Sequence, residues 1–192
     1  AANGTVSVGY KSLFALTSGA GNTAVGYASL STNIDGDNNT AIGTNSLFTF
    51  EANSDGEGGN VSVGASSGYW VSQGENNVFI GYRSGQGITD TRLTGNENTA
   101  VGRDAGYILQ GAAAGNTLIG STAGDAMTSG TNNTVLGSAS DTDDATATNQ
   151  TVIGYATTGV ADNSVTLGNA SVTDVYMSSD SQALVHSAGI QF

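Results

Sequence analysis

Residues 22–26 read Asn22-Thr23-Ala24-Val25-Gly26, and close variants of this stretch recur along the whole chain. The shared pattern is a Val or Thr, any residue, an aliphatic residue and a glycine, and it occurs ten times. Successive glycines lie 17, 17, 21, 17, 21, 18, 17, 17 and 14 residues apart. Such a period predicts a solenoid with one structural unit per repeat. The glycines are Gly9, Gly26, Gly43, Gly64, Gly81, Gly102, Gly120, Gly137, Gly154 and Gly168.

Three further positions of the repeat are nearly as regular as the glycine. The third residue before it is always Val or Thr, and the third residue after it is always small, as in Ser29 and Ser46. Alternating β-branched and aliphatic residues predict a short strand with one buried face. We therefore expect the aliphatic column to form a narrow core, the Thr column to face inward, and the small residue to mark a second extended stretch. The aliphatic column is Val8, Val25, Ile42, Val63, Ile80, Val101, Ile119, Leu136, Ile153 and Leu167.

Asparagine fills the fourth position before the glycine in seven of the ten repeats. We expect these side chains to form a ladder of amides that satisfies backbone groups a thin core cannot hide. The chain has no proline, as expected if nearly every N–H donates to a neighbouring coil. The column is Asn22, Asn39, Asn60, Asn77, Asn98, Asn116 and Asn133.

The predicted architecture is an all-β parallel β-roll of about ten coils over residues 3–172, followed by a C-terminal transition segment, 173–192. Coils that pair strand to strand stack about 4.8 Å apart, so the rod would be about 50 Å long. Val25, Ile42 and Val63 should then form one continuous column. Leu, Ile, Val and Phe make up only 38 of 192 residues, so a single stack buries little. We therefore expect a homotrimer of parallel rods side by side.

Composition narrows the classes of partner. The net charge of −12, with four basic residues in no run, disfavours nucleic acid and anionic membranes. No stretch approaches the roughly 18 apolar residues of a membrane span. Cysteine is absent, so no disulfide framework exists.

The repeats at residues 22–27, 39–43, 98–102 and 116–120 resemble the head repeats of trimeric autotransporter adhesins. They are still more similar to repeats of phage tail fibres and of bacterial injection-machine fibres, because adhesin heads repeat at a shorter period. The resemblance covers residues 3–172. It implies a left-handed winding, three chains side by side, an extracellular location and an adhesive rather than catalytic role.

The resemblance also suggests two readings of function. The favoured one is a structural and receptor-binding fibre segment, on a virion or a secreted injection particle, that attaches to a bacterial surface. The alternative is the head of an adhesin on a bacterial surface that binds host matrix. Residues 169–192 resemble the junction at which phage fibres pass into a self-cleaving chaperone, which would place Phe192 near a maturation cut.

Two longer repeats contain the insertions 49–59 and 89–97, and solenoid insertions commonly form recognition loops. Aromatic faces beside amides and carboxylates suit carbohydrate, so the candidate partner is a cell-surface glycan or an outer-membrane protein. For the neighbouring aromatics Phe48, Tyr82 and Tyr107 the favoured role is packing between chains. The candidate binding residues are Phe50, Tyr69, Trp70 and Arg92.

Other chemistries have weaker support. The acidic turns 35–37, 55–57 and 141–144 are interpreted as solvated turns, with weak Ca²⁺ sites as the alternative, and no other cofactor is expected. The single histidine, His186, has no Cys or second His with which to bind zinc. A carboxylate pair for glycoside hydrolysis is the enzymatic alternative, but no catalytic residue is assigned. An ice-binding solenoid would need outward-facing Thr residues, which the predicted inward Thr column disfavours.

Overall fold

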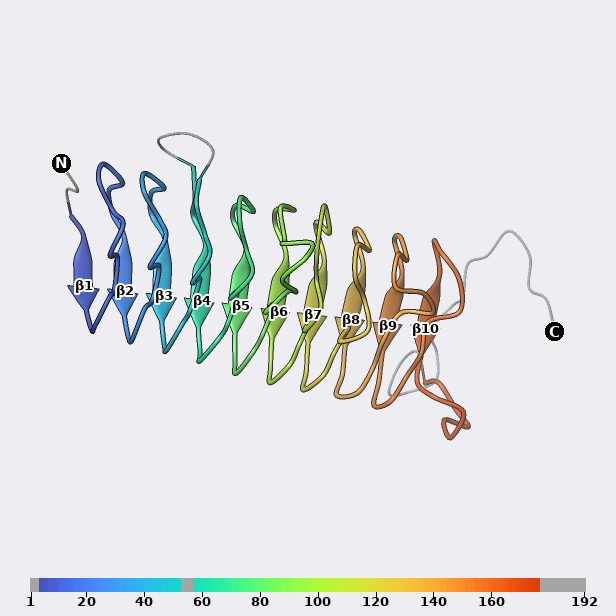
Figure 1. Cartoon of the computed structure of the whole chain (residues 1–192). Helices are drawn as coiled ribbons and strands as arrows, with labels where there is room; N and C mark the ends of the chain where they lie inside the picture. The colour runs from blue at the N-terminus through green and yellow to red at the C-terminus, as the bar shows by residue number, and fades with distance from the viewer. Residues whose placement is uncertain (1–3, 53–56, 177–192) are drawn as a thin grey trace.

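The computed structural model describes residues 4–52 and 57–176 and shows a β-solenoid (Figure 1). Ten parallel strands form one sheet in chain order, and the described residues contain no helix. Each strand has three residues, and its last residue precedes the repeat glycine, which confirms the predicted unit. The strands are β1 (Val6–Val8), β2 (Thr23–Val25), β3 (Thr40–Ile42), β4 (Val61–Val63), β5 (Val78–Ile80), β6 (Thr99–Val101), β7 (Thr117–Ile119), β8 (Thr134–Leu136), β9 (Thr151–Ile153) and β10 (Val165–Leu167).

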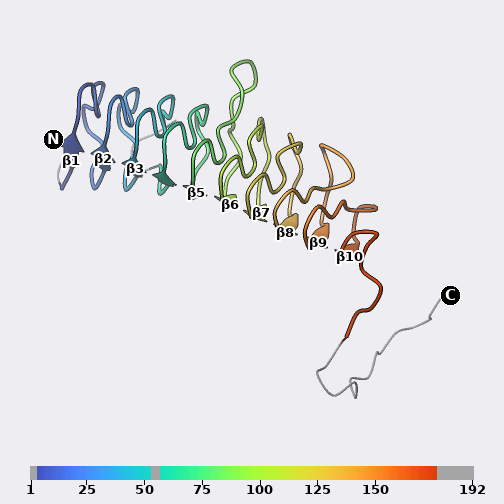
Figure 2. The ribbon, with the colours of Figure 1, turned by 90° about the horizontal axis from the view of Figure 1, so that it is seen from below.

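The register of the sheet confirms the predicted alignment of the repeats. Val25 pairs with Ile42, and Ile42 pairs with Val63, so equivalent residues form one continuous column. The four-residue insertions do not disturb this register, because they are accommodated in the turns. The loop between β5 and β6 projects from the side of the rod (Figure 2).

The predicted direction of the strand faces is wrong. The middle residue of each strand from β2 to β9 is fully buried, whereas the aliphatic column faces outward, with Ile42 40% and Leu136 44% exposed. The Thr and Val residues at the first strand position lie on the same outward face and are partly exposed in β2 to β9. Turn side chains already fill much of the narrow interior, so only one side chain per strand fits inside. A large strand residue fits only where the turn residue beside it is small. The buried middle residues are Ala24, Ala41, Ser62, Phe79, Ala100, Leu118, Val135 and Val152.

In four coils, the size of the buried strand residue and the size of the buried turn residue vary in opposite directions. In β2 and β3 the buried strand residue is alanine, and the fourth residue after the repeat glycine is Leu30 or Leu47. In β5 and β7 the strand residue is larger, and the corresponding turn residue is Gly85 or Gly124. A Cβ atom on Gly124 would lie 2.8 Å from the side chain of Leu118. This inverse relation holds in these four coils but not in β4 and β6, where the small strand residues Ser62 and Ala100 are followed by Gly68 and Gly106.

The small residues after the glycine lie in turns, not in a second strand as predicted. Their hydroxyl groups bridge the interior to the strand of the next coil: Ser67 Oγ donates to the carbonyl of Phe79 at 3.0 Å, and Ser84 Oγ to that of Ala100 at 2.7 Å. The far side of the coil forms no continuous strand in the described residues, but isolated parallel bridges, such as Val71 with Leu93, and backbone hydrogen bonds between turns join it to the next coil. A small residue is needed because the turn lies this close to the neighbouring backbone.

The predicted asparagine ladder is confirmed. Nδ2 of each asparagine from Asn39 to Asn133 donates to Oδ1 of the preceding one at 2.9–3.1 Å. The same Nδ2 atoms also reach turn carbonyls, as from Asn60 to Gly74 at 2.9 Å. The backbone N–H of Gln150 continues the ladder by donating to Asn133 Oδ1. These buried amides thus replace much of the apolar core that the coil lacks.

The predicted domain boundary at residue 172 stays a prediction, because most of the segment after it lies outside the described residues. His186 and Phe192 lie there too, so their proposed roles also stay predictions.

Candidate binding surface

Three of the four candidate binding residues come together on one flank of the rod. The rings of Phe48 and Tyr69 stack with centroids 4.9 Å apart, and Tyr69 meets Trp70 edge to face at 4.6 Å. The guanidinium of Arg92 lies over the Trp70 ring, 5.6 Å from its centroid. Tyr69 and Trp70 are half-buried and Arg92 is exposed, so a ligand can reach this cluster.

The assignment of Phe50 to this surface is wrong, because its side chain is fully buried in the core. Phe50 is the seventh residue after a repeat glycine, a position that also supplies the buried residues Val71, Leu109 and Met127. This recurrence was visible in the sequence and would have placed Phe50 inside.

The backbone holds Trp70 and Arg92 firmly in place. The N–H of Trp70 donates to the carbonyl of Gln86 at 2.7 Å, and its carbonyl accepts from Leu93 N–H at 3.0 Å. Leu93 is fully buried and anchors the insertion next to Arg92. Hydrogen bonds between stacked coils therefore hold the backbone of this cluster in place.

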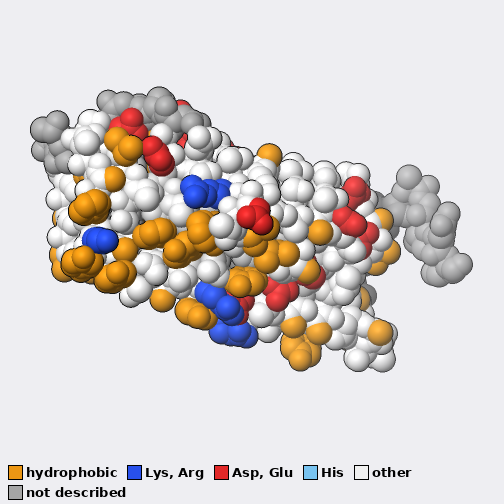
Figure 3. All heavy atoms as spheres, in the orientation of Figure 1, with side chains coloured by type: hydrophobic (Ala, Val, Ile, Leu, Met, Phe, Trp, Pro, Cys, Tyr) orange, Lys and Arg blue, Asp and Glu red, His pale blue; other side chains and the backbone are white. Residues whose placement is uncertain are grey.

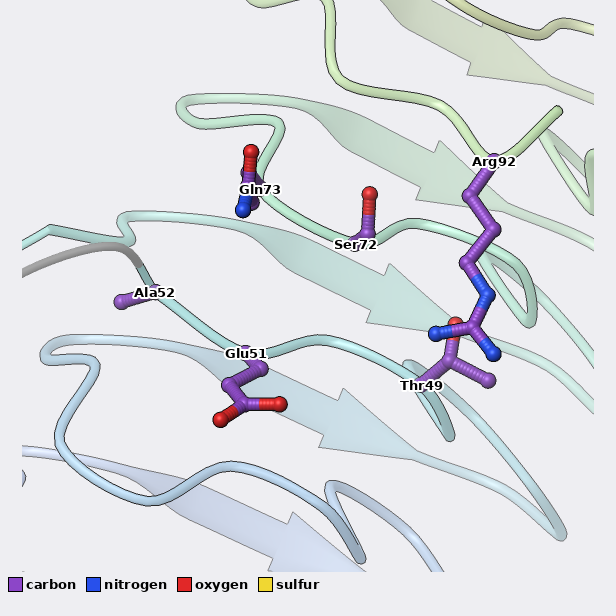
Figure 4. Close-up of a pocket in the computed structure, with 6 residues that line it drawn as sticks. All are labelled: Thr49, Glu51, Ala52, Ser72, Gln73 and Arg92. Carbon is purple, nitrogen blue, oxygen red and sulfur yellow. The ribbon is translucent and has the colours of Figure 1, made fainter.

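A polar pocket of about 320 Å³ opens beside Arg92 (Figure 4). Thr49 Oγ1 lies 2.8 Å from the backbone carbonyl oxygens of both Tyr69 and Val71 and can donate its one proton to either, and Ser72 Oγ donates to the carbonyl of Leu93 at 3.3 Å. Among the described residues, the Glu51 and Gln73 side chains have no hydrogen-bond or ion-pair partner, and the Arg92 guanidinium lies over the Trp70 ring. Its lining residues are Thr49, Glu51, Ala52, Ser72, Gln73 and Arg92.

A second cationic cluster, of two arginines, already contains a carboxylate. Arg83 lies between the rings of Tyr82 and Tyr107, 4.9 and 4.7 Å from their centroids. Its Nε pairs with Asp104 Oδ1 at 2.7 Å, and Arg103 pairs with the other oxygen of that carboxylate. The hydrogen bond to Asp104 raises the pKa of Arg83. This cluster therefore has its anion already in place.

The outward aliphatic column forms an apolar band along the strands, flanked by exposed tyrosines such as Tyr27 and Tyr155. Figure 3 shows another face of the rod, on which hydrophobic side chains also gather in a row, with basic and acidic side chains among them. No charged residue occurs at the two outward strand positions in any of the ten repeats, although the chain has twenty charged residues. Monomeric proteins rarely expose a long row of apolar side chains, so this band is a candidate interaction surface.

The acidic turns use their carboxylates for local structure. Asp37 Oδ1 accepts from the N–H of Ala20 at 2.5 Å, and Asp141 Oδ2 from that of Ala126 at 2.9 Å. Within the described residues no group of three or more carboxylates or histidines is arranged to hold a metal ion. Residues 55 and 56 of the second acidic turn lie outside the described ranges, and weak Ca²⁺ binding stays a prediction.

These carboxylates give a pH prediction. Burial raises the pKa of Asp141 and of Asp125, against the opposing effect of backbone hydrogen bonds. A raised pKa means that the folded state binds the carboxyl protons more tightly than the unfolded state does. The free energy of unfolding therefore falls as the pH rises from the ordinary Asp pKa to the raised one. Hydrogen bonds from Thr146 lower the pKa of Asp144. The stability that ionised Asp144 contributes is therefore lost only when the pH falls below the ordinary Asp pKa.

We therefore expect the thermal unfolding midpoint to rise as pH is lowered from 7 to about 4.5. Calorimetry of the wild type and of Asp141→Asn checks this, and the variant should show a smaller rise. A midpoint that falls steadily over this interval would show that other titrating groups dominate.

No protein-family model, curated protein or solved structure matches this chain. A search of the described residues for a helix long and apolar enough to cross a membrane also finds none. Function therefore has to be argued from the apolar band and the polar pocket.

Proposed function

We propose that this chain is the structural and receptor-binding segment of a homotrimeric fibre, of a phage tail or a contractile injection system, that attaches to a bacterial surface. The observation that carries the proposal is the uncharged apolar band along the whole rod. Ten strands at about 4.8 Å spacing give a band about 43 Å long, and three residues at about 3.3 Å each make it about 10 Å wide, so the strand face covers about 430 Å². Residues beside the strands must supply the rest of the roughly 800 Å² per partner of a stable interface. Parallel rods related by a rotation axis along their length, each contacting its neighbour through two different patches, form a closed ring, and three-fold closure gives a fibre. The left-handed winding implied by the resemblance is part of this proposal.

The flank with Trp70 and the polar pocket would face outward from such a fibre and contact the receptor. Attachment is tested by binding of labelled protein to intact bacteria of several species. Trp70→Ala should weaken binding to a susceptible species by about tenfold without dissociating the trimer, because it removes an aromatic contact and the support of Arg92. Binding to host matrix proteins but to no bacterium would instead support the adhesin reading.

The interface itself gives a sharper prediction. Ile119 lies near the middle of the aliphatic column and is 37% exposed in the single chain. Ile119→Lys would bring three ammonium groups into a desolvated interface, at a cost of several kcal/mol. We expect the mass measured by light scattering to drop from three times 19.0 kDa to 19.0 kDa.

Ser129→Lys is the matched control, since its exposed side chain adds the same charge in a turn. This variant should keep the wild-type mass. If Ile119→Lys also keeps that mass, the apolar band is not the interface.

Ice binding is the second candidate, because the structure overturns the reason for setting it aside. The first strand residue, Thr in β2, β3 and β6 to β9, faces outward instead of inward. Four valines interrupt this column, and the proposed trimer would cover it. Thermal hysteresis in solution would support ice binding, and its absence would leave the face to self-association.

A further inference from the structure

The four basic residues of the chain differ in what they contact. Arg83 and Arg103 both pair with Asp104, and Lys11 lies near the rings of Tyr10 and Phe14 at 5.6 and 5.9 Å. Arg92 has no carboxylate of a described residue within 4.0 Å, and it lines the pocket. In a chain of net charge −12, an exposed arginine at a pocket with no carboxylate partner among the described residues is the strongest candidate for binding an anionic ligand.

Trp70 acts as a positioning residue for this arginine. A guanidinium over an aromatic face keeps its N–H groups available for hydrogen bonds in its own plane. The Trp70 backbone is fixed by hydrogen bonds to Gln86 and Leu93, so the ring offers a rigid support. Arg92 is thereby held beside the pocket with less entropy to lose when an anion binds.

The remaining polar groups of the pocket favour hydroxyl-rich ligands. The Glu51 carboxylate accepts hydrogen bonds and the Gln73 amide both donates and accepts, and neither is engaged by a described residue. Glu51 and Arg92 form no ion pair within 4.0 Å, so they do not neutralise each other directly. The pocket thus combines one cation with separate acceptors for hydroxyl groups.

We propose that this pocket binds a carboxylate-bearing sugar residue of a surface polysaccharide, an inference that rests on the proposed receptor-binding role. The sugar carboxylate accepts hydrogen bonds from the Arg92 guanidinium, and ring hydroxyls donate to Glu51. A neutral sugar would leave Arg92 without an anion, and Glu51 would repel a dianionic phosphate about twice as strongly as a singly charged carboxylate. The volume of about 320 Å³ lies at the small end of the usual range for ligand sites, roughly 300–1,000 Å³, which suits a sugar better than a folded protein epitope.

The test uses two acidic oligosaccharides, trigalacturonic acid and sialyllactose, each beside its methyl ester. Esterification removes the charge and keeps the hydroxyl groups. Calorimetric titration of the full chain should show binding of at least one acid, with its ester bound about tenfold or more weakly. Arg92→Gln should lower binding of the acid to the level of the ester, and Arg92→Lys should give an intermediate value, because it keeps the charge but loses the planar fork.

Lys11→Gln is the matched control, since it removes one positive charge away from the pocket and should leave acid binding unchanged. Equal binding of acid and ester, an unaffected Arg92→Gln variant, or no binding of either acid would overturn the proposal. Competition by an acidic peptide but not by the sugars would identify a protein carboxylate as the ligand and overturn it as well.

Mass and attachment to bacteria, measured on the same preparations, separate this proposal from the proposed function. A trimer that attaches to cells but binds neither acid contradicts only the pocket assignment. A chain that binds an acid but forms no trimer contradicts only the fibre.

Discussion

Gly120→Ala is expected to cost several kcal/mol of stability and to break the rod between two coils. Gly120 has φ +137°, outside the left-handed region that other residues of this chain adopt, such as Thr122 at φ 54°. An added Cβ would lie 2.5 Å from the carbonyl oxygen of Gly137 and 2.9 Å from the backbone N of Ser138. Both are backbone atoms of the next coil, so the methyl group can be accommodated only by separating the coils. Thermal unfolding at fixed protein concentration measures the loss.

Gly111→Ala is the matched control for this prediction. Gly111 has φ +54°, and a Cβ there would meet only a methyl group of Thr91 at 3.7 Å. Its cost should be about 1–2 kcal/mol, that of a left-handed conformation alone. Equal costs at the two sites would show that the stacked glycine column does not keep the coils in close contact.

Asn77→Leu is expected to have a similarly large effect, because Asn77 is a central member of the buried ladder. Its Oδ1 accepts from the backbone N–H of Asn98 at 2.9 Å and from Asn98 Nδ2 at 3.0 Å. Its Nδ2 donates to Asn60 Oδ1 and to the carbonyl of Gly95. Leucine fills much of the same space but leaves buried donors and acceptors unpaired, at about 1–3 kcal/mol each. We expect a total loss of about 3–5 kcal/mol.

Hydrogen exchange would show where this loss is felt. In a solenoid each coil contacts only its neighbours, so protection should fall in β5 and β6 before it falls in distant strands. The control is Asn96→Ala, at an exposed asparagine whose Oδ1 accepts from Glu75 N–H. It should cost about 1 kcal/mol or less. Comparable losses for the two variants would mean that the ladder is not a main source of stability.

The repeat period was sufficient to predict the stacking, the register and the asparagine ladder. Each coil must present the same groups to the next, so these features follow directly from recurrence. The side of each strand that faces the interior was mispredicted. In a three-residue strand only the middle residue points to the opposite side from the other two, so the alternation of apolar and polar residues gives little evidence. The rule that places the apolar face inside assumes a single chain with its own core. Here the apolar face is outward, and the interior residue varies from Ala24 to Phe79.

A compensating pattern in the sequence does indicate the true interior. Where the middle strand residue is Phe79 or Leu118, the turn residue is Gly85 or Gly124, and where it is alanine in β2 and β3 the turn residue is leucine. The pattern fails in β4 and β6, where a small strand residue is also followed by glycine. Only residues that share a confined space need to compensate in this way.

Tyr69, Trp70 and Arg92 were identified as candidates from their place near the insertions. The pocket was not predicted, because Glu51 and Arg92 come from two insertions whose paths the period does not determine.

In the proposed trimer, two other copies of the chain cover the outward face of the sheet. Sedimentation equilibrium of the wild-type protein at micromolar concentration tests this arrangement most directly. We expect a single species of three times 19.0 kDa whose unfolding midpoint rises with protein concentration. A folded species of 19.0 kDa, stable on dilution with its apolar band exposed to water, would contradict it.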